Sequence, residues 1–391
     1  MNQSRIFLKT LMLLLIISLI FLFFQLKQLA VFTLHQIQPL NPDDVVTDEE
    51  TGIRYVYDQL IVSFSMDTDL TTIENVIDDV NGEIIGGISD IKIVQVKINN
   101  LNNKADLDSV ISQLKTYSAV KAACLNTVTT ITSTENPVDP WKEGYKAGDK
   151  IYNEKNPGGS NWGLEAIKAY SAWQLGGELS TVKVGVVDGG FYINNPELKI
   201  PKNHATGVDG SYLLSGSKYN EIVSEFWNQH GTFVSGIICA IRDNQIGVAG
   251  VANNCDLFVF RTEQQEIAVM FGIERCLQEK CKIINLSMGN TITEERQQLI
   301  FDGKISVDSD IDTLNECVMW TNALNKWIKR YGGDFLIIEA AGNDFVDARW
   351  NGNLCCITDE KYQDYFLVVG GSADVGKKYE HYYDTYIDED G

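Results

Sequence analysis

The sequence predicts an α/β protein in which helices cover both faces of a parallel β-sheet, preceded by a smaller unit and an N-terminal membrane helix. Three observations lead to this fold class. From residue 161 onward, short apolar runs alternate with amphipathic stretches, a pattern typical of strands and helices that build a parallel sheet. Residues 55–132 alternate between strand and helix periodicity in a different order. Residues 11–24 contain no charged side chain.

The N-terminal segment, residues 1–35, has the features of an uncleaved signal anchor. Arg5 and Lys9 precede Leu11–Phe24, whose 14 uncharged residues suit a signal-peptide core and are fewer than the ~20 of a full span. No small-x-small cleavage motif follows, and apolar residues resume at 29–34. We therefore expect a single-pass membrane protein whose globular part is exported. A cleaved signal peptide, which would give a secreted protein, is the alternative.

Overall charge and cysteine spacing exclude some classes of function. The chain has 32 Lys and Arg against 53 Asp and Glu, a formal net charge of −21, which repels nucleic-acid phosphates. We therefore expect no nucleic-acid partner. The eight cysteines include no Cys-x-x-Cys motif, so they indicate no metal or redox site. Cys276 and Cys281, or Cys355 and Cys356, could pair after export, and unpaired structural cysteines fit the pattern equally well.

Residues 55–132 are predicted to form a ferredoxin-like unit. The apolar residues indicate, in order, a strand at 59–64, a helix at 70–80, strands at 83–88 and 91–98, a helix at 107–114 and a strand at 120–131. The unit contains no histidine, so we expect a binding or folding module without chemistry. On its flanks, the polar, acidic residues 36–54 are predicted to be a tether and residues 133–160, with three prolines and Gly158-Gly159, a linker.

Residues 161–391 carry the strand–helix alternation of the parallel sheet. Helices are predicted over 264–279 and 312–330, each with apolar residues on one side. Ligands of such sheets bind beyond the carboxyl ends of the strands, so the residues at those ends are the candidate site. The predicted strands are 182–187, 255–260, 282–286, 335–341 and 365–369.

Polar residues and glycines follow three of these strands. Asp188-Gly-Gly follows the first, Ser287-Met288-Gly289 the third and Gly342-Asn343 the fourth. His230 precedes a run of small residues at the predicted start of a helix and could reach the same edge. An aspartate that orients a histidine is the base half of a nucleophilic triad, and a side-chain amide nearby can donate to an oxyanion.

Each residue alone has an ordinary structural explanation. Asp188 could be a turn residue or a helix cap, His230 a structural histidine, and Asn343 a left-handed turn residue. A dinucleotide-binding turn is excluded because the G-x-G-x-x-G spacing is absent. A phosphatase of the haloacid-dehalogenase type would require a second Asp where Gly190 stands.

Taken together and in this chain order, the motifs resemble those of the subtilisin-like serine proteases. Residues 55–132 also resemble the inhibitory, fold-assisting propeptide of that family, so the likeness runs from about residue 55 to the end. The matching stretches are Val186-Val-Asp-Gly-Gly190, His230-Gly-Thr-Phe-Val-Ser-Gly236, Asp243–Ala252, Asn285-Leu-Ser-Met-Gly289, Ala340-Ala-Gly-Asn343 and the start of the mature enzyme at Asn161-Trp-Gly-Leu-Glu165.

The resemblance implies a role for each candidate residue. His230 would act as general base and then general acid, oriented by Asp188, and Asn343 would stabilise the oxyanion. The backbone of Ser287, Met288 and Gly289 would pair with an extended polypeptide substrate. The chain's own propeptide, residues 55–132, would bind residues 161–391 as an inhibitor binds its enzyme, with its last strand leading into the cleft. No cofactor is required. A calcium ion is possible because the loop at Asn244 resembles a cation loop of the family, although an ordinary loop fits equally well.

The sequence departs from the family pattern at the nucleophile. The family carries Gly-Thr-Ser after the asparagine motif, whereas the only Gly-Thr here is Gly231-Thr232 in the histidine motif. Ser372 is the only serine after Asn343, and it lies outside any such motif. We therefore expect a truncated, inactive form of a serine endopeptidase. The alternatives are a non-catalytic relative that binds peptides and a membrane-anchored interaction protein that uses residues 55–132. Smaller departures are Gly189, Asn195 and Ser235, in place of the family's usual Ser or Thr, His and Ala.

Overall fold

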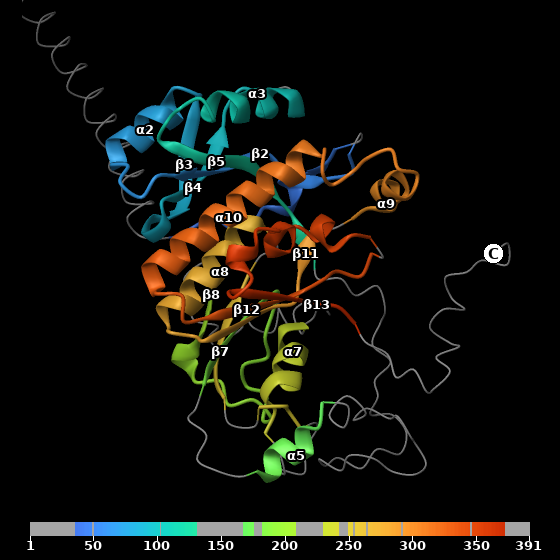
Figure 1. Cartoon of the computed structure of the whole chain (residues 1–391). Helices are drawn as coiled ribbons and strands as arrows, with labels where there is room; N and C mark the ends of the chain where they lie inside the picture. Colours follow the sequence, from blue (N-terminus) through green and yellow to red (C-terminus); the bar gives the residue numbers. More distant parts are fainter. Residues whose placement is uncertain are drawn as a thin grey trace, which may run out of the picture.

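The computed structural model of the chain describes two units joined by a continuous core (Figure 1). The described residues are 36–48, 51–101, 103–130, 167–175, 182–208, 230–241, 249–252, 255–262, 265–290, 292–344 and 346–371. The predicted anchor, the linker at 133–160, Asn244 and Ser372 lie outside these ranges. Within them, no helix combines the length and the apolar character needed to cross a bilayer.

The N-terminal unit is an antiparallel sheet with two helices on one face. Its main strands lie in the order β5–β2–β4–β3, and each neighbouring pair is antiparallel. The order of elements along the chain is the strand–helix–strand–strand–helix–strand order predicted from the sequence. These elements are β2 (Arg54–Phe64), α2 (Leu70–Asp78), β3 (Gly82–Ile88), β4 (Ile93–Ile98), α3 (Lys104–Leu114) and β5 (Val120–Thr127), with a short 3-10 turn η2 (Ser89–Ile91).

Local sequence explains where the two helices of this unit begin. Asp69 precedes α2, and its carboxylate accepts a hydrogen bond from the Thr72 N–H at 2.7 Å. Asn103 precedes α3 and accepts in the same way from the Asp106 N–H at 3.3 Å. Both caps satisfy backbone donors that a helix start leaves free, so each helix begins where its apolar periodicity begins.

Part of the predicted tether is packed against this sheet. The short strand β1 (Val45–Thr47), after the turn η1 (Pro42–Asp44), pairs with the start of β2. Ile37 is buried, and the Gln38 N–H donates to Gln95 Oε1 at 2.7 Å. Composition alone indicated a solvated segment, because its few apolar residues become buried only through contacts made by distant strands.

The second unit contains a six-stranded parallel sheet in the order β13–β12–β10–β7–β9–β8. Five strands coincide with predicted ones, and the parallel sheet is confirmed. The strands are β7 (Lys183–Asp188), β8 (Ala205–Gly207), β9 (Asp256–Arg261), β10 (Ile283–Leu286), β12 (Leu336–Ala340) and β13 (Phe366–Val369). Its shorter elements are α5 (Ala169–Gln174), η3 (Lys202–His204), β11 (Gly289–Asn290), α9 (Glu294–Phe301), η5 (Ala348–Asn351), η6 (Asn353–Cys356) and η7 (Glu360–Tyr362). A further two-residue strand, β6 (Thr129–Thr130), follows β5 of the N-terminal unit.

Helices cover both faces of the parallel sheet, as predicted. The helices α8 (Glu266–Gln278) and α10 (Ile311–Tyr331) lie between the parallel sheet and the N-terminal sheet, and α7 (His230–Cys239) lies on the opposite face (Figure 1). Alternate residues of the strands reach the two faces: Val187 and Phe258 join the core with α8, whereas Val186 joins the cluster beneath α7. Every residue of α8 except Arg275 and Gln278 is buried, because a sheet lies on each side of this helix.

Candidate active site

The structure brings Asp188 and His230 together at the carboxyl edge of the parallel sheet. Asp188 ends β7 and is fully buried, and His230 begins α7 with its side chain 21% exposed. The Nδ1 atom of His230 lies 2.9 Å from each carboxylate oxygen of Asp188. Burial raises the pKa of Asp188, while the hydrogen bonds from His230 and from the Gly189 N–H, the latter at 2.7 Å, oppose that rise. The predicted contact between Asp188 and His230 is therefore present.

Small residues place the start of α7 against the sheet. Gly231, Ser235 and Cys239 are the buried residues of α7, one turn apart along the side that faces β7. A Cβ atom on Gly231 would lie 2.6 Å from both the Gly190 carbonyl oxygen and the Phe191 ring, so a larger residue would displace the helix. The next residue, Thr232, accepts a hydrogen bond at its Oγ1 from the Tyr192 N–H at 2.5 Å. His230 is thus oriented by backbone packing as well as by Asp188.

The predicted substrate-pairing residues follow β10 directly beside Asp188. In the register of β10 and β7, Leu286 is opposite Val187, so Ser287 comes level with Asp188. Met288 is buried, whereas Gly289 begins β11. The Asn285 side-chain amide donates to Ser287 Oγ at 2.9 Å and fixes the start of this segment.

The N-terminal unit already occupies this strand edge. The two residues of β6, which follow β5, pair antiparallel with β11: Thr130 is opposite Gly289 and Thr129 is opposite Asn290. On the other side, Val128 forms an antiparallel bridge with Gln265, just before α8. Residues 128–130 therefore lie as an added strand between two segments of the parallel-sheet unit, which is how an extended peptide binds an open strand edge.

Asn343 lies two strands away from Asp188 at the same edge of the sheet. It is exposed and follows Gly342, whose φ of +90° places the backbone in a region that favours glycine. The sheet order β12–β10–β7 sets the positions of Asn343, Ser287 and Asp188 along the edge. The three candidate segments are thus brought to one edge, and the close contact is that between Asp188 and His230.

Two residues of this region gave no signal in the sequence. Asn351, at the end of η5, is buried, and its side-chain amide donates to the Ala340 carbonyl oxygen at 2.9 Å. A Cβ on Gly289 would lie 1.9 Å from Asn351 Oδ1, and a Cβ on Gly342 would lie 3.0 Å from the same atom. The Asn351 side chain therefore fills the space between β11 and the loop that carries Asn343.

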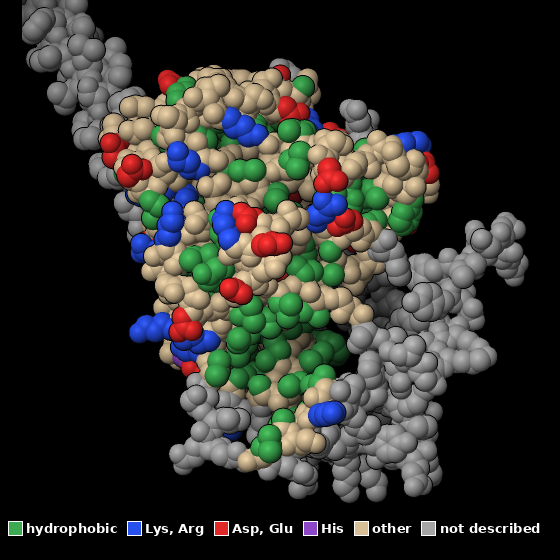
Figure 2. All heavy atoms as spheres, in the orientation of Figure 1, with side chains coloured by type: hydrophobic (Ala, Val, Ile, Leu, Met, Phe, Trp, Pro, Cys, Tyr) green, Lys and Arg blue, Asp and Glu red, His purple; other side chains and the backbone are tan. Residues whose placement is uncertain are grey.

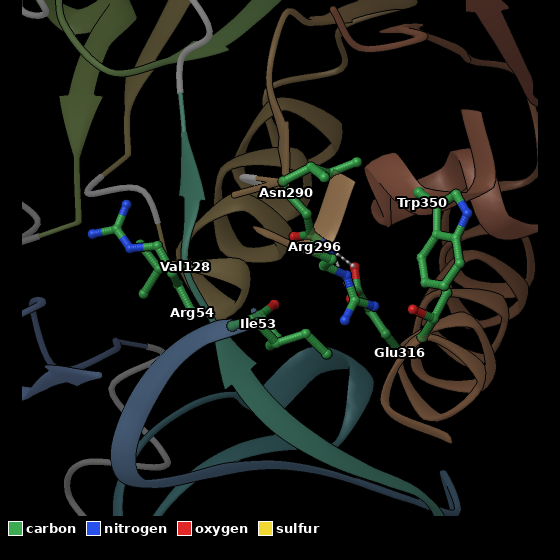
Figure 3. Close-up of a pocket in the computed structure, with 10 residues that line it drawn as sticks. Ile53, Arg54, Val128, Asn290, Arg296, Glu316 and Trp350 are labelled. Carbon is green, nitrogen blue, oxygen red and sulfur yellow. Dashed lines mark hydrogen bonds between the residues drawn. The ribbon is translucent and has the colours of Figure 1, made fainter. Parts of the chain in front are cut away.

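Glu316 of α10 is the second such residue. Its carboxylate accepts hydrogen bonds from the Asn290 side chain at 2.8 and 3.0 Å and from the Asn353 N–H at 3.0 Å, and burial raises its pKa to about 6. Figure 3 shows Glu316 and Asn290 lining a small pocket that both units form. The Arg296 guanidinium in the same pocket stacks over Trp350 and pairs at 3.2 Å with Asp310, whose side chain is 6% exposed. Periodicity could not single out these residues, because their role arises only where the two units meet.

A metal site is not visible in the part of the chain that the structure describes. Within those residues, no three His, Cys, Asp or Glu side chains are grouped as ligands for an ion. The predicted calcium loop at Asn244 lies outside them.

A parallel sheet with an Asp–His pair at its carboxyl edge, together with a preceding unit whose end lies along the adjacent strand edge, defines a subtilisin-like α/β domain with a prodomain. Residues 180–373 match the subtilase family, Peptidase S8, and residues 41–126 match the fervidolysin N-terminal prodomain. The chain therefore carries a subtilase domain preceded by a fervidolysin-type prodomain, as the motifs indicated.

Individual relatives match this chain over part of their own length. Subtilisin DY of Bacillus licheniformis is 33% identical over 187 residues, which are 46% of this chain and 54% of that protein. Thermitase of Thermoactinomyces vulgaris is 30% identical over 136 residues, 34% of this chain and 45% of that protein. The chain thus spans about half the length of these relatives. The crystal structure of fervidolysin from Fervidobacterium pennivorans superposes with a TM-score of 0.45 at 17% identity, over 79% of this chain and 42% of that one.

Proposed function

We propose that the chain is the pro-form of a subtilisin-like serine endopeptidase, in which the prodomain occupies the substrate strand edge. The observation that carries this proposal is the pairing of Thr129 and Thr130 with Gly289 and Asn290, beside the Asp188–His230 pair. A polypeptide substrate would replace residues 128–130 and use the same backbone groups. Because the ladder uses main-chain groups, it binds many sequences in one register.

The Asp188–His230 geometry is suited to proton transfer at a peptide bond. With Nδ1–H donating to Asp188, the neutral imidazole presents Nε2 as the acceptor of a proton. Asp188 would hold this tautomer and stabilise the imidazolium that forms. The Asn343 side-chain amide would donate to the oxyanion, as in other acyl-transfer sites. These steps need no metal ion or organic cofactor, and a calcium ion near Asn244 would have a structural role.

The nucleophile is the missing part of this chemistry within residues 1–391. No Gly-Thr-Ser motif occurs in the sequence, so we propose that this chain by itself forms no acyl-enzyme. The oxyanion donor and the strand edge could still support a rate of roughly 10³–10⁴ over water, as in triad-deleted enzymes. The second candidate function, peptide binding without cleavage, is favoured by the same β6–β11 pairing, which needs no serine.

A fluorophosphonate probe tests the chemical part of the proposal. The purified chain should remain unlabelled and full-length, and a His230→Ala variant should give the same result. Labelling of any serine, Ser372 in particular, would show that a nucleophile exists outside the family motif. Labelling that disappears in His230→Ala would further show that the Asp188–His230 pair activates that serine.

Hydrogen exchange tests the prodomain part. In an antiparallel pair only alternate N–H groups face the partner strand, so one of the Gly289 and Asn290 amides should be covered by β6 and exchange slowly. Thr130→Pro, which disrupts β6, should accelerate its exchange. Thr68→Ala, in the turn that precedes α2, should leave that amide protected. Unchanged protection in Thr130→Pro would show that β6 does not cover the strand edge.

The membrane location is a separate proposal that rests on Leu11–Phe24 and the basic residues before it. We propose a single-pass anchor with residues 36–391 outside the cytoplasm. Protease added to intact cells or spheroplasts should then remove the globular part. A fully soluble cytoplasmic pool would contradict this topology.

A further inference from the structure

Six of the eight cysteines lie in three spatial pairs, of which the sequence suggested Cys276 with Cys281 and missed the other two. The first pair connects the last turn of α8 to the start of β10. The Cys281 N–H donates to the Cys276 carbonyl oxygen at 2.9 Å, and both residues are buried. A Cβ on Gly185 of β7 would lie 2.6 Å from Cys276 Sγ and 3.3 Å from Cys281 Sγ, so the two sulfur atoms face the same point of the sheet. Burial and the hydrogen bond with Cys281 raise the pKa of the Cys276 thiol.

The second pair connects α10 to η6. Cys317 Sγ donates to the Cys356 carbonyl oxygen at 2.8 Å, across 39 residues of sequence. The two thiols also interact directly: the hydrogen bond with Cys356 lowers the pKa of Cys317, whereas burial, and then this hydrogen bond, raise the pKa of Cys356. The neighbouring thiol of Cys355 is instead 3.5 Å from the Ala340 carbonyl oxygen, beside Asn351. The structure therefore favours Cys317 over Cys355 as the partner of Cys356.

The third pair connects the end of α7 to the residue before β9. Cys239 is the last residue of α7, and Cys255 packs against the apolar cluster that contains Cys239. The hydrogen bond between their thiols raises the pKa of Cys239 and lowers that of Cys255. The Gly250 N–H donates to the Ala240 carbonyl oxygen at 3.1 Å and returns the intervening chain to the end of α7.

We propose that Cys239–Cys255, Cys276–Cys281 and Cys317–Cys356 are three disulfide-forming pairs, and that Cys124 and Cys355 remain thiols. In each pair one thiolate attacks a disulfide donor, such as oxidised glutathione or a disulfide oxidoreductase, breaks its S–S bond, forms a mixed disulfide and releases one donor sulfur as a thiolate. The second thiolate of the pair then attacks the protein sulfur of this mixed disulfide, forms the protein disulfide and releases the remaining donor sulfur as a thiolate. The two protein thiols lose two protons and two electrons, and the donor disulfide accepts the two electrons.

Each pair includes a cysteine that lies at the end of, or next to, an element that leads to the candidate active site. Cys239 ends the helix that begins with His230, and Cys281 precedes the strand that leads to Ser287. Cys356 ends η6, the element that follows Asn351 and contacts Glu316 through Asn353. A disulfide at each position would limit how far these elements can separate when the chain partly unfolds.

Counting thiols in the full chain tests the assignment. The protein is refolded in a glutathione redox buffer, denatured without reductant, and alkylated, and the alkyl groups are counted by intact mass. Two groups are expected, on Cys124 and Cys355, against eight after full reduction, and peptide mapping should find the three linked pairs. Eight groups in the unreduced sample, or a linked peptide that contains Cys124 or Cys355, would overturn the proposal.

A double variant tests each pair independently of the other two. Cys276→Ser with Cys281→Ser should remove one linked peptide and leave the other two unchanged, with two alkylated cysteines as before. Should this variant not fold, the mapping of the unmodified chain still decides the assignment. Absence of one of the three linked peptides from the unmodified chain would refute that pair.

Discussion

The two faces of the parallel sheet differ in how they are covered. On one face, α8 and α10 are enclosed by the prodomain sheet, and Trp320 and Trp327 of α10 are fully buried. On the other face, Phe233 and Ile237 of α7 are 68% and 54% exposed, and Leu367 of the edge strand β13 is 53% exposed. Figure 2 shows hydrophobic side chains gathered on the lower part of the molecule, where Figure 1 places α7. The core cluster on the prodomain face is therefore the larger one, whereas the helix that carries His230 packs on a smaller cluster.

Truncation of one large side chain on each face gives the largest expected difference. Trp320→Ala should lower the free energy of unfolding by about 3–5 kcal/mol, because it leaves a cavity between α10 and its neighbours. Phe233→Ala on the exposed side of α7 should change it by less than about 0.5 kcal/mol. Urea unfolding of the full chain measures both. Equal losses would show that the two faces contribute equally.

Buried ionisable groups on the prodomain face predict an unusual pH dependence. Lys326 of α10 donates to Ser63 Oγ of β2 at 2.6 Å, and burial, together with Lys121, lowers its pKa to about 7. Because the unfolded chain then binds more protons between pH 7 and 10.5, this lysine makes stability rise with pH in that window. Lys326→Met with Ser63→Ala should raise the free energy of unfolding near neutral pH by on the order of 3 kcal/mol and remove the rise. Lys329→Met, an exposed control on the same helix, should do neither.

Between pH 4.5 and 7, by contrast, two buried glutamates are expected to make the free energy of unfolding fall as the pH rises. Burial raises the pKa of Glu316 to about 6 and that of Glu274 to about 7, so the folded chain binds more protons than the unfolded chain above pH 4.5. Their contribution to stability is present below pH 4.5 and is lost as the pH rises through 6 to 7. In Glu316→Gln, the free energy of unfolding should therefore fall less steeply between pH 4.5 and 7, as measured by urea unfolding at a series of pH values. A stability that increases steadily from pH 4.5 to 7 would contradict the prediction.

A smaller effect is expected where α7 meets the sheet. Gly231→Ala places a Cβ 2.6 Å from the Gly190 carbonyl oxygen and should cost about 1–3 kcal/mol. It should also lengthen the contact of His230 with Asp188, which the NMR signal of the histidine Nδ1–H would report. Ser235→Ala is the matched control, because the Ser235 hydroxyl has no hydrogen-bond partner among the described residues. An unchanged Nδ1–H signal in Gly231→Ala would show that α7 adapts without moving His230.

The smallest predicted loss concerns the side chain behind the strand edge. Asn351→Ala removes the hydrogen bond to the Ala340 carbonyl oxygen and should cost about 1–2 kcal/mol. It should also accelerate amide exchange at Gly289, since the Asn351 side chain packs against that residue. Asn322→Ala, on the exposed side of α10, should change neither quantity. Normal protection of Gly289 in Asn351→Ala would show that this side chain does not support β11.

The sequence predicted the elements whose pattern is local. The strand at 282–286 and the helix at 264–279 were found because their apolar runs are long and are bounded by polar residues. The Asp188–His230 contact was predicted because the two motifs occur in the chain order of a known family. Such signals need no knowledge of what packs against them.

The elements that sequence reasoning missed depend on distant partners. Ala205–Gly207 is too short to give a strand signal and pairs with β9 across about fifty residues. The helix α9 has polar residues on all sides and only Arg296 buried, so it has no apolar stripe. Asn351 and Glu316 act on β11 from the loops and the helix that surround it, a relation that no local pattern encodes.

The burial of α8 has a consequence for how the chain folds. Almost every residue of this helix is buried in the folded chain, so the helix is not stable in water before one of its two sheets has formed. Contacts that close this core, such as the hydrogen bond from Lys326 to Ser63, join residues 263 positions apart. Loops of that length close late, and intermediates with exposed apolar surface aggregate. During synthesis, however, the prodomain leaves the ribosome before α8 does. The prodomain sheet can therefore pack against α8 as soon as the helix emerges. The order of the two units along the chain thus shortens the time for which α8 is exposed to water.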